Sequence, residues 1–126
     1  MTSNKLIEDI ANCLDAKDAE RFATYFTVHG TYRTGNQPPV TGRENILEHA
    51  KTFFNIVKTN KHSIVSVEET PSSIIWQGIV SYERVDGLTV TCLHCTILHL
   101  DGDKIKQYMV YCDNNEFYSP MGGGKA

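Results

Sequence analysis

Apolar residues in the first half of the chain recur at the spacing of amphipathic helices. A first helix is predicted from positions that share one face, which are Leu6, Ile7, Ile10, Ala11 and Leu14. Asp18 is a suitable cap for a second, shorter helix that ends before Gly30. Thr41 and Glu44 have the spacing of a capping box, and the apolar residues that follow predict a third helix up to Val57.

After Asn60 the spacing of apolar residues changes from helical to alternating. Stretches rich in Val, Ile, Thr and Tyr predict strands at residues 62–70, 74–85, 88–100 and 104–113, after a short one at 31–33. Asp86-Gly87 and Asp101-Gly102 are typical of tight hairpin turns, so we expect antiparallel pairing. The order predicts an α+β fold in which about three N-terminal helices pack on a strongly curved, mostly antiparallel sheet.

Length and composition indicate one domain of ordinary globular type. We expect residues 1–118 of the 126 to form that domain and the glycine-rich residues 119–126 to form a flexible tail. The formal charge of −3, with no basic stripe, argues against nucleic acid as a partner. No apolar run approaches the ~20 residues of a membrane helix, and the N-terminus lacks a signal-peptide core. We therefore expect a cytoplasmic protein without membrane partners.

The four cysteines are expected to be free thiols, and no metal or other cofactor is predicted. Cys92-Leu93-His94-Cys95 has the spacing of a redox or zinc motif. In a strand, however, residues three apart point to opposite faces and cannot meet at one metal.

Two stretches carry a resemblance to a known superfamily. One is Gln37-Pro38-Pro39-Val40-Thr41-Gly42-Arg43-Glu44, and the other runs from Asp101-Gly102-Asp103-Lys104-Ile105 to Tyr111-Cys112-Asp113-Asn114. Over residues 3–118 the chain resembles the nuclear transport factor 2-like superfamily, and within it the SnoaL-like polyketide cyclase and ketosteroid isomerase-like branch. The resemblance implies a cone-shaped half-barrel with a pocket between helices and sheet.

The catalytic residues of ketosteroid isomerases are not present at the matching positions. The resemblance puts Arg33 where that family keeps its catalytic aspartate, Ile10 where it keeps a tyrosine, and Thr96 where it keeps an aspartic acid. Because a guanidinium cannot act as a carboxylate base, standard ketosteroid isomerase activity is not expected.

Pairing across the hairpins predicts which side chains face the pocket. A two-residue loop at 86–87 gives the pairs Ile79–His94, Gln77–Thr96 and Ser81–Cys92, and the next hairpin gives His94–Val110, Thr96–Tyr108 and Cys92–Cys112. The resemblance places Thr96 on the pocket side. The predicted ligand-binding residues are then Gln77, Ile79, Ser81, Glu83, Thr96, Tyr108 and Val110, with Arg33 opposite.

His94 and Asp113 are the catalytic candidates. An imidazole among apolar neighbours has a pKa near working pH and suits a general acid or base, although His94 also fits a core histidine bonded to Gln77 or Ser81. Asp113 follows the last strand, where SnoaL-like cyclases carry a catalytic acidic residue, although it also fits an Asx turn with Asn114 and Asn115. The other histidines, which are His29, His49, His62 and His99, are expected to be solvated.

Two further groups of residues have a predicted role. Arg33, Glu83 and Tyr108 form the polar end of a ligand site, or alternatively Arg33 and Glu83 form an ion pair. The face opposite the pocket is too apolar for solvent and predicts a homodimer interface, composed of Trp76, Val80, Tyr82, Leu93, Cys95, Ile97, Met109 and Tyr111.

Two functions agree with these features. One is an acid/base enzyme, an isomerase, cyclase or dehydratase, that acts on a small hydrophobic carbonyl compound. The other is a domain that binds a small ligand, or pairs as a dimer, without catalysis. A transport factor that engages protein partners is a third and weaker interpretation.

Overall fold

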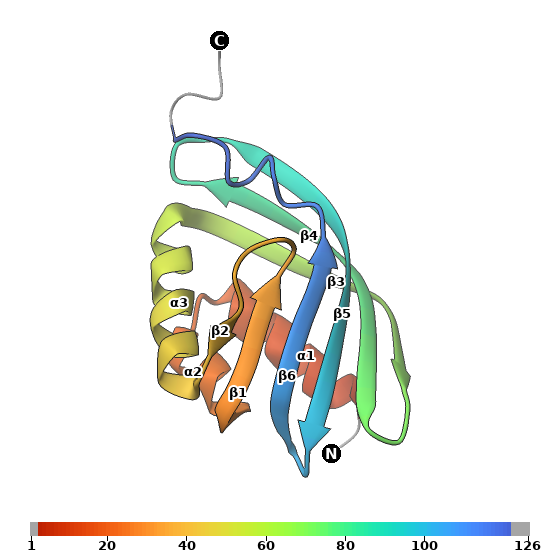
Figure 1. Ribbon diagram of the computed structural model, residues 1–126. Helices are drawn as coiled ribbons and strands as arrows, with labels where there is room; N and C mark the ends of the chain where they lie inside the picture. Colours follow the sequence, from red (N-terminus) through yellow and green to blue (C-terminus); the bar gives the residue numbers. More distant parts are fainter. Residues whose placement is uncertain (1–2, 122–126) are drawn as a thin grey trace.

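Helices and strands occur close to where the spacing of apolar residues predicts them. The computed structural model describes residues 3–121. The elements in chain order are α1 (Ser3–Asp15), α2 (Ala19–Thr24), β1 (Phe26–Thr34), β2 (Val40–Thr41), α3 (Arg43–Ile56), β3 (Val57–Glu69), β4 (Ser73–Arg84), β5 (Thr89–Asp101) and β6 (Lys104–Cys112) (Figure 1). The predicted α+β class is confirmed, with β1 and β2 inserted between the second and third helices. None of the described helices is long and apolar enough to cross a membrane.

The start of α2 is set by a local cap, whereas the start of α3 is held by a contact with another element. Asp18 caps α2 as predicted, because its Oδ1 accepts a hydrogen bond from the Arg21 amide at 3.1 Å. The predicted capping box at the start of α3 does not form. Gly42 occupies the cap position with a φ of 99° and no side-chain bond, and Arg43 instead donates to the Phe26 carbonyl at 2.6 Å.

The six strands form one curved, open sheet whose concave face is covered by the helices (Figure 1). The strand order is β2-β1-β6-β5-β4-β3, and only β1 and β6 pair in parallel among the described strands. The main core joins Ile7 and Ile10 of α1 to Trp76 and Leu98 of the sheet. Burial of these side chains holds the helices against the concave face.

Gly78 lies in the middle of β4. Nearby, the register between β3 and β4 shifts between Ile64 and Ser66. A Cβ atom at Gly78 would overlap the Ser63 carbonyl oxygen and lie 2.6 Å from His94 Nε2 and 2.8 Å from Trp76 Nε1. The close approach of these groups therefore requires glycine at this position.

The register of β4 against β5 differs by one residue from the predicted one. Gly78 pairs with His94, and Trp76 pairs with Thr96. The cause is the loop: the Arg84 amide donates to the Leu88 carbonyl at 2.8 Å, which makes the loop three residues long instead of two. Because side chains alternate along a strand, this shift moves every β4 side chain to the face opposite the predicted one.

The register of β5 against β6 differs by two residues from the predicted one. The side chains of both strands therefore keep their predicted faces. Thr96 pairs with Val110 and Leu98 with Tyr108, whereas the sequence predicted Thr96 opposite Tyr108. An irregularity between His99 and Leu100 lies near the turn. Tyr108 and Val110 thus keep their predicted orientation toward the helices.

After β6 the chain crosses the end of the sheet formed by β4 and β5 (Figure 1). The predicted tail begins at Ser119, and the Ser119 and Pro120 carbonyls accept hydrogen bonds from Arg84 at 2.7 and 3.2 Å. The remainder of that predicted tail, residues 122–126, lies outside the described residues.

Gly78→Ala tests the close approach in β4. The added Cβ must displace a backbone carbonyl, so we expect the free energy of unfolding to fall by about 1–3 kcal/mol in urea titrations. Gln77→Ala, at the exposed neighbouring position, should change it by no more than about 0.5 kcal/mol. Equal stability of the two variants would contradict this account of Gly78.

Candidate functional site

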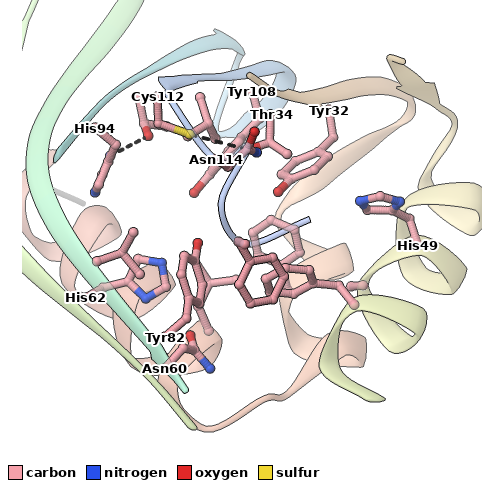
Figure 2. A pocket seen from close by; sticks show the side chains of 18 of the residues that line it. Tyr32, Thr34, His49, Asn60, His62, Tyr82, His94, Tyr108, Cys112 and Asn114 are labelled. Carbon is pink, nitrogen blue, oxygen red and sulfur yellow. Dashed lines mark hydrogen bonds between the residues drawn. The ribbon is translucent and has the colours of Figure 1, made fainter. Parts of the chain in front are cut away.

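A cavity of about 60 Å³ lies between the concave face of the sheet and the helices (Figure 2). The residues from the sheet that line it are Tyr32, Thr34, Asn60, His62, Trp76, Val80, Tyr82, His94, Thr96, Tyr108, Val110 and Cys112. Helix α3 contributes His49, Phe53 and Phe54 among others, and the segment after β6 contributes Asn114, Phe117 and Tyr118. The cavity is therefore mainly aromatic, with a few polar groups.

Four of the predicted site residues line this cavity. They are His94 and Thr96 on β5 and Tyr108 and Val110 on β6. These two strands kept their predicted faces, which is why the four residues come together.

The predicted β4 residues lie on the other face, and that prediction is wrong. Gln77, Ile79, Ser81 and Glu83 all moved there with the one-residue shift of register. Ser81 Oγ lies 3.2 Å from Thr91 Oγ1, which belongs to the same outer face.

Conversely, three residues assigned to the outer face line the cavity. They are Trp76, Val80 and Tyr82. His49 and His62, which were expected to be solvated, also line it.

Arg33 and Asp113 do not line the cavity. Arg33 Nε donates to the Gln37 carbonyl at 2.9 Å, because Tyr32 and Thr34, not Arg33, take the inward positions of β1. No Arg33–Glu83 ion pair occurs among the described residues. Asp113 is exposed, and its Oδ1 accepts from the Asn115 amide at 3.2 Å, which is the Asx-turn alternative.

His94 is buried in the wall of the cavity, with 7% of its surface exposed. Its Nδ1 lies 2.9 Å from Thr96 Oγ1, and its Nε2 has no hydrogen-bond partner within residues 3–121. Burial, and secondarily the neighbouring His62, lowers the pKa of His94 to about 4. The imidazole is therefore neutral at neutral pH.

His62 forms a pair with Asp15 at the edge of the cavity. Asp15, the last residue of α1, accepts a hydrogen bond from the His62 backbone amide at 2.9 Å, and its Oδ1 lies 2.7 Å from His62 Nδ1. This carboxylate selects the tautomer with the proton on Nδ1 and leaves Nε2 as the available nitrogen. The His62 and His94 rings lie 6.2 Å apart between centroids (Figure 2).

The sequence carried no local signal for the Asp15–His62 pair. The two residues are 47 positions apart, and each alone looks like a surface residue at the end of an element. Only the packing of α1 against β3 brings them together.

Other polar atoms in the cavity wall lack partners. In the described part of the chain, Asn60 Oδ1 and Nδ2 and Trp76 Nε1 are buried without a hydrogen bond. Burial also raises the pKa values of Tyr82 and Tyr108, so both phenols stay protonated. Unpaired buried polar atoms are rare in proteins and suit groups that meet water or a ligand.

No group of three or more His, Cys, Asp or Glu side chains suitable for a metal ion is found in residues 3–121. Cys92 lies on the inner face, and Cys95 pairs with Tyr111 on the outer one. All four cysteines are free thiols in the structure.

A cavity between helices and a curved sheet is the feature that defines this protein as a small α+β pocket protein. A SnoaL-like domain matches residues 7–108, so the chain belongs to the SnoaL-like domain family. No curated protein sequence matches the chain significantly.

Several solved structures share the fold. A protein from Catenulispora acidiphila with a ketosteroid isomerase-like fold, in complex with trimethylamine, has a TM-score of 0.80 and 16% identity, covering 87% of this chain and 86% of that one. An NTF2-like protein of unknown function from Burkholderia pseudomallei has a TM-score of 0.84 and 9% identity, covering 98% and 100%. An LEH-like epoxide hydrolase from M. tuberculosis has a TM-score of 0.77 and 13% identity, covering 95% and 89%.

The lowered pKa of His94 predicts how stability depends on pH. Between the ordinary value of 6.5 and about 4, the unfolded chain binds a proton that the folded protein does not. Stability should therefore fall by up to about 3 kcal/mol as the pH decreases through this range. Urea unfolding from pH 7 to pH 4.5 measures the fall, and His94→Gln should make it smaller by removing this group. An NMR titration midpoint for His94 above pH 6 would refute the assignment.

Proposed function

We propose that the protein is an acid/base enzyme that acts on a small, hydrophobic carbonyl compound, as an isomerase, cyclase or dehydratase. The observation that carries the proposal is the Asp15–His62 pair, whose imidazole lies beside His94 in the wall of a mainly aromatic cavity. Such reactions need a positioned base, a hydrogen-bond donor to a developing oxyanion, and a site that holds little water. The cavity offers side chains for the first two needs, and its apolar walls exclude water.

In this proposal His62 Nε2 takes a proton from the carbon next to a carbonyl group. The Asp15 carboxylate holds the ring in the required tautomer and stabilises the imidazolium that forms. The same nitrogen then returns the proton to another position of the substrate, or to a leaving hydroxyl group. His94 is not assigned as the base, because its pKa is too low for efficient proton abstraction at neutral pH.

His94 has a different role, as a hydrogen-bond donor to the carbonyl oxygen. When the Thr96 hydroxyl donates to Nδ1, the proton of the neutral imidazole is on Nε2. Trp76 Nε1–H is a second donor without a partner among the described residues, and its indole lies beside the His94 ring, with centroids 4.8 Å apart. Two donors in a cavity of low polarity stabilise an oxyanion far better than they would in water.

The substrate class follows from the wall of the cavity. Aromatic and aliphatic side chains dominate, and no Lys, Arg, Asp or Glu is among the residues that line it. A charged substrate would lose its hydration without a partner, which favours a neutral one. The neighbours that bind trimethylamine or hydrolyse epoxides support small molecules as ligands of this fold.

Binding without catalysis is the second candidate function. The observation in its favour is the absence of the ketosteroid isomerase residues at Ile10, Arg33 and Thr96. A pocket that only holds a ligand needs its apolar walls and one or two polar contacts, which Asn60 and Trp76 offer.

Exchange of α-protons for deuterium tests the proposed base. Hydroxyacetone and acetone, which are smaller than a ring, are the probes, and NMR in D₂O measures loss of the α-proton signals. We expect the wild type to exceed the buffer rate, His62→Gln to lose about 100-fold or more of the excess, and Asp15→Asn to lose part of it. Gln77→Ala, on the opposite face, is the control and should retain the full rate.

The outcomes separate the two candidate functions. Exchange that persists in His62→Gln would mean that another group is the base. Binding of a probe, seen by NMR shifts, with no exchange above the buffer rate would instead support the binding function.

We also propose that the protein forms a homodimer through the outer face of the sheet. Leu93 is 77% exposed and lies near Val65 and Tyr111, which are also exposed apolar residues. A shallow groove runs between them. A second copy would remove this apolar surface from water.

Sedimentation of Leu93→Glu tests the dimer. A charge at the centre of the face should weaken self-association about 100-fold or more, because it would be buried without a partner. Thr52→Glu, at an exposed position of α3 on the opposite side of the sheet, is the matched control and should sediment as the wild type does. A wild type that is monomeric at micromolar concentration would rule the dimer out.

The cytoplasm is the proposed location. Support comes from the four free thiols, since a reducing compartment keeps cysteines in this state.

A further inference from the structure

The segment after β6, residues 113–121, covers one end of the cavity. Asn114, Phe117 and Tyr118 line the cavity from this segment. Phe117 is only 1% exposed, and its ring centroid lies 5.3 Å from that of Phe53 and 4.9 Å from that of Tyr82. Phe117 thus fills the space between α3 and β4 and closes the cavity at this end.

The backbone of this segment is tied to the sheet by Arg84. The guanidinium is 1% exposed, and its Nη1 donates to the Phe117 and Ser119 carbonyls, both at 2.7 Å. Nη2 donates to the Pro120 carbonyl at 3.2 Å. The Asp86 carboxylate accepts from Nε at 2.8 Å and from Nη2 at 2.6 Å, and its negative charge balances that of the guanidinium.

The other walls of the cavity are held in a different way. Strands β4, β5 and β6 are joined by continuous ladders, and α3 packs on the core through Ile46, Ala50 and Phe54. Segment 113–121 belongs to neither a strand nor a helix. Its backbone is held to the sheet mainly by Arg84, with one long hydrogen bond from Cys92 Sγ to the Asp113 carbonyl at 3.4 Å, and this makes it the wall that costs least to open.

The size of the cavity limits the ligands that it holds in this conformation. Its volume is about 60 Å³. An apolar cavity of about 150 Å³ is known to hold one benzene molecule. A ring-sized ligand therefore cannot occupy the closed cavity without displacing one of its walls.

We propose that residues 113–121 form a hinged cover, held closed by Arg84, and that Phe117 sets the largest ligand that the cavity admits. Displacement of Phe117 adds the volume of its ring to the cavity and opens the route between Phe53 and Tyr82. The inference rests on the proposed function only in that the cavity binds a small molecule, and it requires no catalysis.

Phenol binding tests Phe117 as the size limit. Phe117→Ala should bind phenol at least tenfold more tightly than the wild type, measured by calorimetry and by NMR shifts of His94. Val90→Ala is the matched control, because Val90 packs in the same small apolar cluster but does not line the cavity. Equal phenol affinity in the wild type and Phe117→Ala, with both proteins folded, would overturn the size limit.

Hydrogen exchange tests the cover itself. Arg84→Met should speed exchange of the amides in 113–121 at least tenfold while leaving those of β5 unchanged. Arg43→Met also removes an arginine bonded to a backbone carbonyl, that of Phe26, and should leave 113–121 unchanged. Acceleration over the whole protein, or none in 113–121, would overturn the hinged cover.

A milder variant keeps the test usable if Arg84→Met does not fold. Asp86→Asn leaves the arginine in place and removes the carboxylate that orients it, so exchange in 113–121 should still rise, by a smaller factor. No rise in this variant would count against the cover. Phenol binding and amide hydrogen exchange are measured without turnover. They can therefore support the cover when the α-proton test contradicts the proposed enzyme, and they can contradict the cover when the α-proton test supports the enzyme.

Discussion

The pairing of Arg84 with Leu88 across a three-residue loop is the constraint on which the site depends. It sets the register of β4 on β5, and the register decides that Trp76, Val80 and Tyr82 face the helices. The same arginine binds Asp86 within the loop and the carbonyls of the C-terminal segment. One buried cation therefore connects the turn, the orientation of β4 and the closure of the cavity.

The polar groups of the cavity depend on that register and on the absence of a side chain at Gly78. With β4 in its observed register, the Trp76 indole lies edge-to-face on His94, with centroids 4.8 Å apart. Glycine at position 78 lets both nitrogens approach the backbone of β4. The apolar surroundings then keep His94 neutral, which makes it a hydrogen-bond donor or acceptor and not a cation.

A second connection runs from the end of α1 to β3. Asp15 accepts both from the backbone and from the ring of His62, so the end of the helix positions a side chain of the sheet. The carboxylate stands behind the imidazole and not in the cavity, and it is absent from the residues that line it. Its charge can therefore act on His62 without making the cavity itself hydrophilic.

The sequence by itself determined the class of fold and most of the elements. Helical spacing up to Val57 and alternation after Asn60 are local properties, and they arise because each element must bury one apolar face. The inward orientation of His94, Thr96, Tyr108 and Val110 was also predictable, since an error of two residues in register leaves the faces unchanged.

Tertiary structure decided the rest. A loop of two or three residues fits the same Asp-Gly signal, yet the difference reverses four predicted residues, Gln77, Ile79, Ser81 and Glu83. The Asp15–His62 pair and the Arg84 contacts join residues 47 and 33 to 36 positions apart, and no local pattern encodes such distances. Alternation and capping are determined by neighbours in the chain, whereas register and contacts between elements are determined by packing of the whole fold.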